Sequence, residues 1–451
     1  MSVSPASNSA SVPPPPVELL QRLIRFDTTN PPGNERECVA YIKGLLDQAG
    51  CDSTIVGRDA NRPNLIARLK GQGTSPPLLL FGHIDVVTTA NQAWQYPPFQ
   101  GELVDGYVWG RGALDMKGGI VMMLLAFLRA KAEGVTLPGD VVLAVVSDEE
   151  AGGDYGASYL VDQHSELFHG IRYAIGEFGG FSYNIGRRRF YPIMVAEKQV
   201  CRLRATVRGT GGHAALAGNG GAMSRLARLL NRLEDCRLPV HVTPVTRQMI
   251  RAISSKLPPP ASWAMRLVLN PGLTNLGLKL MGDKGLQFRP LFHNTVNATI
   301  VRGGEKINVT PSEISVDLDA RLLPGFCPED VLAELRGILG KQGEEVELEI
   351  VRHDPGAGEP DMGLFDRLAG ILRRADPQGT PVPMLLPGAT DARYFAKLGI
   401  QTYGFTPMRL PPGFNFMQTI HGPDERLPVE ALDFGTDAIY QLLRASPSGV
   451  S

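Results

Sequence analysis

The sequence has few cysteines, and their placement excludes two kinds of cross-linked fold. Cys38, Cys51, Cys201, Cys236 and Cys327 are scattered over the 451 residues, and no two of them form a Cys-x-x-Cys pair. Disulfide frameworks of small secreted domains and thiolate zinc sites both require closer, repeated spacing. We therefore expect free thiols in a reducing, cytoplasmic compartment.

Long apolar runs and an excess of one charge are also missing. The longest strongly apolar run, residues 120–128, is too short to cross a bilayer. Residues 1–16, rich in proline and serine, lack the basic start and apolar core of a secretory signal and predict a disordered tail. With 45 Lys+Arg against 46 Asp+Glu, the net charge of -1 offers no basic surface for nucleic acid. We expect neither a nucleic-acid nor a membrane partner.

What the chain does have is apolar material, 43% of its residues, in alternating helical and strand patterns. Short apolar runs predict strands at 64–69, 77–85 and 141–148, and a longer run predicts a helix at 118–134. Strands that are apolar throughout and alternate with helices are typical of an α/β fold with a mostly parallel central sheet.

The pattern changes near residue 198 and returns near residue 353. Between them the predicted order is β-α-β-β-α-β, which is typical of a ferredoxin-like domain. We therefore expect one domain over 17–197 and 353–451, with a second domain, 198–352, inserted into it. The segment 239–294 is too long for a plain connection. It either walls an apolar substrate pocket or forms a small helical subdomain that packs on its host.

The stretch SDEEAGG, residues 147–153, raises a question of charge balance. Asp148, Glu149 and Glu150 follow one another at the end of an apolar strand. Adjacent carboxylates raise one another's pKa and destabilise a fold unless a cation lies among them. The alternative is a solvated acidic turn.

Other polar residues at predicted strand ends and loops offer ligands for such a cation. His83 and Asp85 point to the same side of a strand end, where one could bind a metal and the other orient it. Asp115, in a glycine-rich turn before the helix at 118, could bind metal or cap that helix. Glu177 ends another apolar strand, and His421 lies in a polar loop.

Two imidazoles and three carboxylates are about what two divalent ions with a shared carboxylate require. Nitrogen and oxygen ligands without cysteine suit zinc, with cobalt and manganese as alternatives. The candidate metal ligands are His83, Asp115, Glu150, Glu177 and His421.

The runs FGHIDVV, WQYPPFQGELVDGYVWGRGALDMKGG, SDEEAGG and GTGGHA occur in this order and resemble the di-zinc aminoacylase/carboxypeptidase superfamily, the clan MH metallopeptidases. The resemblance extends over nearly the whole chain, from TTNPPGNE to HGPDE. It implies a zinc-exopeptidase-like catalytic domain, with the inserted domain as a lid and as the dimerisation surface of a homodimer.

The resemblance also implies roles for the polar residues. Asp115 would bridge the two metal ions, and Asp85 would orient His83 from behind. Glu150 would be a metal ligand, together with Glu177 and His421. Glu149 would act as the general base that takes a proton from the metal-bridging water.

For the inserted domain, the resemblance implies that His213 stabilises the oxyanion in the neighbouring subunit's active site. Asn297 would make a polar contact with the substrate, and Arg321 would bind its carboxylate. The alternative for Arg321 is a structural salt bridge with Asp317 or Asp319.

The loop LPGATDARYF, residues 386–395, resembles the family's substrate loop, in which Gly388 and Thr390 would bind substrate. It has Gly-Ala-Thr where Gly-Gly-Thr is common, which is a mild departure from the family pattern.

These features predict a metal-dependent hydrolase that cleaves the amide bond of an N-acyl amino acid or a short peptide with a free carboxylate. A deacetylase or desuccinylase of a biosynthetic intermediate is one alternative, and a relative that binds metal or peptide without turnover is another. The presence of Glu149 argues against the second alternative, because a binding protein has no use for a base.

Overall fold

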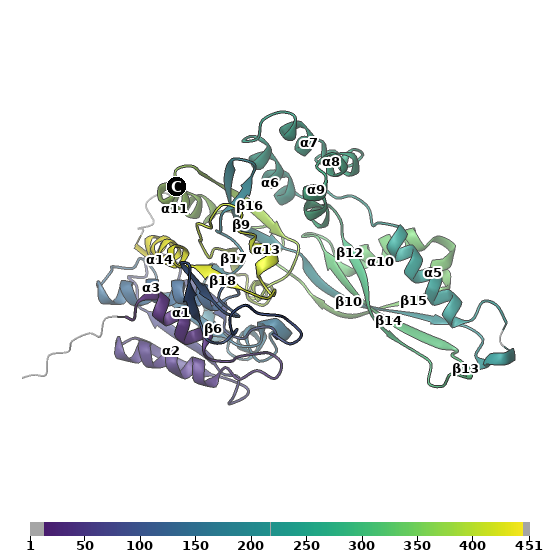
Figure 1. The fold of residues 1–451 in the computed structure, drawn as a ribbon, viewed down its shortest axis with the longest axis horizontal. Coiled ribbons are helices and arrows are strands. Elements are labelled where there is room, and N and C mark those ends of the chain that lie inside the picture. Colours follow the sequence, from purple (N-terminus) through teal and green to yellow (C-terminus); the bar gives the residue numbers. More distant parts are fainter. Residues whose placement is uncertain (1–12, 217, 445–451) are drawn as a thin grey trace, which may run out of the picture. The chain divides into compact units, whose positions relative to one another are not determined.

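The computed structural model describes residues 13–216 and 218–444, which fold into two compact units (Figure 1). Unit 1 comprises the described residues up to 195, together with 361–383 and those from 390 onward. Unit 2 comprises 196–360 and 384–389. Of the predicted tail, residues 1–12 lie outside the described residues, and Pro16 already belongs to the first helix.

Unit 1 is built on a nine-stranded sheet. Its central strands β6, β3, β7 and β17 are parallel, and antiparallel strands flank them on both sides. The sheet is therefore mixed, with the predicted parallel arrangement at its centre. In sheet order the strands are β1 (Asp52–Val56), β2 (Asn64–Leu69), β6 (Val141–Val146), β3 (Leu78–His83), β7 (Tyr173–Gly176), β17 (Gln401–Gly404), β9 (Arg188–Glu197) and β16 (Gly379–Leu386), with β8 (Tyr183–Ile185) paired to β9.

Helices cover both faces of this sheet because its central strands are apolar on both sides. All six residues of β6 are buried, and those at 142, 144 and 146 share a core with α4 and α12. Helix α3 is buried along nearly its whole length and packs against α1 and α14. The helices of unit 1 are α1 (Pro16–Ile24), α2 (Arg36–Gln48), α3 (Lys117–Ala132), α4 (Ala157–Gln163), α11 (Phe365–Ala375), α12 (Ala392–Ala396), α13 (Phe416–Thr419) and α14 (Val429–Arg444).

Short elements complete unit 1. A three-stranded sheet joins β4 (Glu102–Val104), β5 (Tyr107–Trp109) and β18 (Arg426–Pro428). Two 3₁₀ turns are η1 (Glu149–Ala151) and η2 (Ser165–Phe168).

Unit 2 follows the predicted β-α-β-β-α-β order. Its four long strands form an antiparallel sheet in the order β12-β14-β10-β15, against which α5 and α10 pack. The elements are β10 (Gln199–Arg208), α5 (Ala222–Asp235), β12 (Thr295–Arg302), β14 (Glu313–Leu322), α10 (Pro328–Leu339) and β15 (Val346–Asp354), with the smaller β11 (Gly212–His213), η3 (Ala214–Leu216), β13 (Val309–Thr310) and η5 (Gly340–Glu345) between them.

The expected boundary after residue 352 requires correction. Strand β15 continues to Asp354, where it still pairs with Val200 of β10, so the boundary at 352 would cut a strand. Residues 353–360 therefore belong to unit 2, as does the short segment 384–389.

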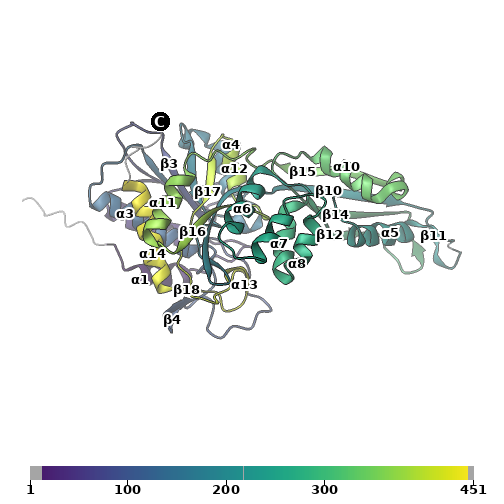
Figure 2. The same cartoon turned by 90° about the horizontal axis from the view of Figure 1, so that it is seen from above.

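The segment 239–294 is mostly helical, which agrees with the alternative of a small helical subdomain. It contains α6 (Pro244–Ser254), α7 (Ala261–Leu267), α8 (Thr274–Leu280), α9 (Asp283–Phe288) and η4 (Arg289–Phe292). Helices α6, α7 and α8 lie together in Figures 1 and 2. The buried Lys198 fixes the end of the segment, because the ammonium donates hydrogen bonds to the carbonyls of Pro290 at 3.3 Å and His293 at 2.9 Å.

The five cysteines are all free thiols. Among the described residues, no helix combines the length and the apolar character needed to span a bilayer.

Candidate metal centre

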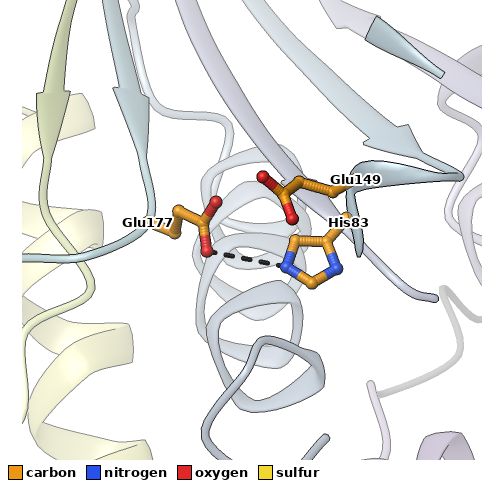
Figure 3. A group of neighbouring side chains, drawn as sticks. All are labelled: His83, Glu149 and Glu177. Carbon is orange, nitrogen blue, oxygen red and sulfur yellow. Dashed lines mark ion pairs between the residues drawn. The ribbon is translucent and has the colours of Figure 1, made fainter. Parts of the chain in front are cut away.

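Three neighbouring strands of unit 1 bring acidic and imidazole side chains to one edge of the sheet. Strands β6, β3 and β7 are adjacent and parallel, so their carboxyl ends meet. His83 is the last residue of β3, Glu149 follows β6, and Glu177 follows β7 directly. Figure 3 shows the three side chains converging on one space.

His83 is the centre of this group. Its side chain is 1% exposed, and its Nδ1 lies 3.0 Å from the backbone oxygen of Asp85. Its Nε2 lies 3.2 Å from Asp115 Oδ1 and 3.5 Å from Glu177 Oε2, so without a cation it donates its proton towards these carboxylates. Burial lowers the pKa of His83, but the contacts with Asp115, Asp85 and Glu177 outweigh it and raise the pKa well above its usual value.

Asp85 supports both His83 and the turn that carries the paired glutamates. Its carboxylate accepts hydrogen bonds from Asn30 Nδ2 at 2.8 Å and from the backbone N–H groups of Glu149 and Glu150, each at 3.1 Å. Burial raises the pKa of Asp85, but the hydrogen bonds with His83 and Asn30 outweigh burial, so the pKa lies below its usual value. Asp85 is therefore positioned to orient the imidazole and to fix the turn.

Asp115 lies between two imidazoles. Its Oδ1 is 3.2 Å from His83 Nε2, and its Oδ2 is 3.1 Å from His421 Nε2. Burial raises the pKa of Asp115, but the hydrogen bonds with both histidines lower it to well below its usual value. The alternative that Asp115 caps the following helix is wrong, since Met116 is the N-cap residue and makes no side-chain capping bond.

Glu150 and His421 complete this side of the group. Glu150 Oε1 lies 3.1 Å from His421 Nε2, so the imidazole contacts two carboxylates at once. The hydrogen bond with Asp115 has the larger effect and the one with Glu150 the next, and together they raise the pKa of His421 to about 10. Burial raises the pKa of Glu150 above its usual value.

Glu149 and Glu177 point towards each other beside the His83 ring (Figure 3). Burial raises the pKa of Glu177 to about 7, and it raises the pKa of Glu149 well above its usual value. A cation would stabilise the ionised form of both carboxylates, because they are buried among like charges.

The donor set fits divalent metal ions. Ligand atoms lie within 4.8 Å of one another in two groups that share His83, and each residue supplies one oxygen or nitrogen. The first group is His83, Glu149 and Glu177, and the second is His83, Asp115 and Glu150. Mixed nitrogen and oxygen donors at such spacing suit metals of the zinc class.

A buried arginine, Arg62, was not predicted from the sequence. It neutralises Asp148, the first acid of the SDEEAGG turn. Arg62 Nη1 lies 2.9 Å from Asp148 Oδ1, and Arg62 Nη2 lies 3.0 Å from Glu35 Oε1. Asn30 joins the network, because its Nδ2 donates to Asp148 at 3.0 Å as well as to Asp85. The available signals were the polar residues within TTNPPGNE and the Arg-Pro-Asn run at 62–64.

Glu425 was missed as well, although it lies in the HGPDE run. This fully buried carboxylate accepts hydrogen bonds from Arg111 Nη1 at 2.6 Å and from the backbone N–H groups of Gly112, Leu114 and Asp115 at 2.8–3.0 Å. It therefore holds the glycine-rich turn in the conformation that directs Asp115 towards both histidines.

We predict that Glu425→Gln weakens metal binding about 10–100-fold, since outer residues that fix ligands have effects of this size. The same change leaves the buried Arg111 without its anionic partner, so the free energy of unfolding should fall by about 3–5 kcal/mol. Competition with a chelating dye and denaturant titration measure the two effects. Glu430→Gln, at an exposed position on α14, is the control, and equal metal affinity in both variants would remove this role.

The three residues of unit 2 that were predicted to contact substrate are either exposed or paired with another residue of the chain. His213 is exposed, and its Nδ1 accepts a hydrogen bond from the N–H of Ala215 at 3.2 Å. Asn297 is exposed on β12. Arg321 forms an ion pair with Asp319 at 3.0 Å, which is one of the partners named in the structural alternative. Substrate contacts by these three side chains stay predictions.

Gly388 and Thr390 differ in accessibility. Gly388 is half-buried, whereas Thr390 is 2% exposed and its hydroxyl accepts a hydrogen bond from the N–H of Ala392 at 3.1 Å. Their contact with substrate also stays a prediction.

Comparison with known proteins gives one consistent result. The family model described as peptidase family M20/M25/M40 matches residues 79–445. The chain is 27% identical to aminoacylase-1 from Homo sapiens over 448 residues, which cover 96% of each chain.

Two solved structures are similar in fold. The M20 family metallo-carboxypeptidase Sso-CP2 from Sulfolobus solfataricus has a TM-score of 0.68 at 17% identity, covering 95% of this chain and 98% of that one. The YXEP protein from Bacillus subtilis, described as a dinuclear metal binding peptidase, has a TM-score of 0.60 at 14% identity, covering 95% of this chain and 96% of that one.

Proposed function

Because the chain belongs to peptidase family M20/M25/M40, a family of metallopeptidases and amidohydrolases, we propose that its substrate is an N-acyl amino acid or a short peptide with a free carboxylate. The scissile bond is the amide next to that carboxylate. The observation that carries this proposal is the convergence of His83, Glu149 and Glu177 on one edge of the sheet beside Asp115.

Five side chains would hold the two divalent ions, zinc first and cobalt or manganese as alternatives. Asp115 would be shared, because it lies between both imidazoles. When bound, the ions would polarise the scissile carbonyl and lower the pKa of water. The proposed ligands are His83, Asp115, Glu150, Glu177 and His421.

Glu149 is the proposed general base. Its carboxylate would accept a proton from the attacking water and later release it. The water oxygen bonds to the carbonyl carbon, the carbon–nitrogen bond breaks, and Glu149 gives the proton to the leaving nitrogen. Asp85 keeps the Glu149 backbone in place through its 3.1 Å hydrogen bond.

We further propose that unit 2 is a ferredoxin-like lid and the dimerisation domain of a homodimer. His213 of one subunit would donate a hydrogen bond to the oxyanion in its partner. Arg321 would bind the substrate carboxylate, for which its guanidinium has to exchange Asp319 for the substrate. Asn297, Gly388 and Thr390 are the other proposed contacts.

Removal of an acetyl or succinyl group from a biosynthetic intermediate is the alternative that uses the same chemistry. A relative without turnover is disfavoured by the placement of both glutamates of the turn beside the histidines. The five free thiols support the proposal of a reducing, cytoplasmic compartment.

The test is release of free amine from a panel of N-acyl amino acids, dipeptides, and N-acetyl and N-succinyl intermediates. We expect activity on a carboxylate-bearing amide that chelation abolishes and added zinc, cobalt or manganese restores. His421→Ala should lower bound metal and activity together, whereas His164→Ala, a half-exposed histidine of unit 1, should change neither. Unchanged activity after complete metal removal would refute the proposal.

A further inference from the structure

The segment 237–289 of unit 2, called here the helical subdomain, carries charge of one sign. It has eight basic residues and one acidic residue, whereas the whole chain has 45 and 46, so the remainder is acidic. Among the side chains of this segment that the structure describes, no lysine or arginine forms an ion pair, whereas His241 lies 2.6 Å from Glu334. The basic residues are Arg237, Arg247, Arg251, Lys256, Arg266, Lys279, Lys284 and Arg289.

Three of these cations face one groove. The groove has a volume of about 460 Å³ and is lined by Arg237, Lys279 and Arg289, with Leu278 and Leu286 as its apolar surface. Positive charges that share a concave, partly apolar space attract an anion, since the low-dielectric wall strengthens the field there. We call Arg237, Lys279 and Arg289 the basic groove.

Helix α8, which forms one side of the groove, also exposes an apolar stripe. Leu273, Leu276 and Leu280 have the i, i+3, i+7 spacing of one helix face and are 38%, 51% and 61% exposed. Thr274 and Gly277, on the other side of α8, are buried. The three leucines, called here the leucine face, therefore point away from the core of the subdomain.

Exposed apolar side chains continue beyond α8. Trp263 of α7 is 63% exposed and Leu286 of α9 is 55% exposed. Helix α8 contacts both α7 and α9, and the three helices lie together in Figure 1. Leucine and tryptophan next to lysine and arginine are the composition of surfaces that bind to a bilayer interface.

We propose that the surface of α7–α9 docks on an anionic phospholipid bilayer, with a lipid phosphate in the basic groove and the leucine face in the interfacial layer. A phosphate oxygen accepts hydrogen bonds from arginine in a matched planar geometry. Each basic residue near an anionic surface contributes about 1 kcal/mol. The acidic remainder of the chain is repelled by the same surface, which orients the contact.

Charge decides between this occupant and a second copy of the chain. A symmetric dimer through α7–α9 would bring two basic surfaces together, because each subunit presents the same patch. The one acidic residue of each subdomain, the exposed Asp283, is too few to neutralise the eight basic residues that each copy carries. The expectation of no membrane partner rested on the lack of a spanning segment, and peripheral docking needs none.

The test is co-sedimentation of the full-length protein with vesicles of phosphatidylcholine alone or of equal parts phosphatidylcholine and phosphatidylglycerol. We expect binding only to the anionic vesicles and loss of binding at high salt. The variant R237Q/K279Q/R289Q should lower the partition coefficient about 100-fold, since it removes three favourable charges. L276N/L280N should lower it about tenfold, because the apolar anchor is lost.

The matched control is R187Q/R373Q/R374Q, which removes three exposed charges from unit 1 and should bind like the parent protein. Failure of the parent protein to bind anionic vesicles, or equal binding by the groove variant and the control, would overturn the proposal. Inorganic phosphate and poly-glutamate are the competing probes. If poly-glutamate binds with the same affinity and L276N/L280N has no effect, the occupant is an acidic protein segment instead.

Light scattering tests the remaining alternative, in which a second copy of the chain covers the leucine face. If L276N/L280N turns a dimer into a monomer and no variant binds vesicles, the leucine face is an interface between copies and the lipid proposal is wrong. Amine release by the same samples is expected to be unchanged, because neither variant touches the metal centre. The membrane proposal and the hydrolase proposal therefore fail independently.

Discussion

Glu149→Gln should lower kcat about 10²–10⁴-fold, the range that a positioned general base contributes. The amide has nearly the size of the carboxylate but accepts no proton, so water attack loses its base. Bound metal and thermal stability should stay close to those of the parent protein, because the five proposed ligands are intact. Steady-state kinetics and elemental analysis of one preparation measure both effects.

The control for this variant is Glu166→Gln, an exposed carboxylate of unit 1, which should leave kcat unchanged. The adjacent glutamate gives a sharper comparison. Glu150→Gln should lower bound metal, because Glu150 contacts His421, whereas Glu149→Gln should lower turnover alone. Metal loss in Glu149→Gln with full occupancy in Glu150→Gln would mean that the two glutamates have exchanged roles.

His213→Ala should lower kcat about 10²–10³-fold if its imidazole stabilises the oxyanion, since one lost donor has an effect of this size. When the donor comes from the partner subunit, mixing His213→Ala and Glu149→Ala chains restores one intact site in each heterodimer. Random exchange of equal amounts should then recover about a quarter of the parent activity.

The control mixture combines Glu149→Ala with Glu150→Ala. Both residues lie on the same turn of one chain, so every site in their heterodimer keeps one defect and no activity should return. Recovery in this control would indicate contamination or reversion. A monomeric mass by light scattering, with no recovery in the His213 mixture, would mean that each site is completed within one chain.

Local sequence patterns were sufficient to predict the elements and several of the residues that the fold brings together at one edge of the sheet. The apolar run at 141–148 predicted a buried strand, and all six residues of β6 are buried. His83, Glu149 and Glu177 could be identified because each stands where an apolar strand ends, and parallel strands end at one edge of a sheet. The β-α-β-β-α-β order of unit 2 likewise follows from periodicity, because period and burial are encoded within a few neighbouring residues.

The partners of these residues were decided only by the tertiary structure. Glu425 fixes Asp115 across 310 positions of sequence, and Asn30 reaches Asp148 across 118. Nothing in the local pattern of either residue selects such a partner, since the choice depends on which strands lie side by side. The sequence raised the question of a cation for three adjacent acids, and the fold supplies Arg62 for one of them.

The surface of the helical subdomain shows the same difference between what the sequence predicts and what only the fold decides. Its basic residues can be counted in the sequence, but their convergence on one groove depends on how α8 and α9 fold against each other. The spacing of Leu273, Leu276 and Leu280 predicts a shared helix face. Only packing decides whether such a face is buried or exposed, because that depends on which side of the helix its neighbours cover.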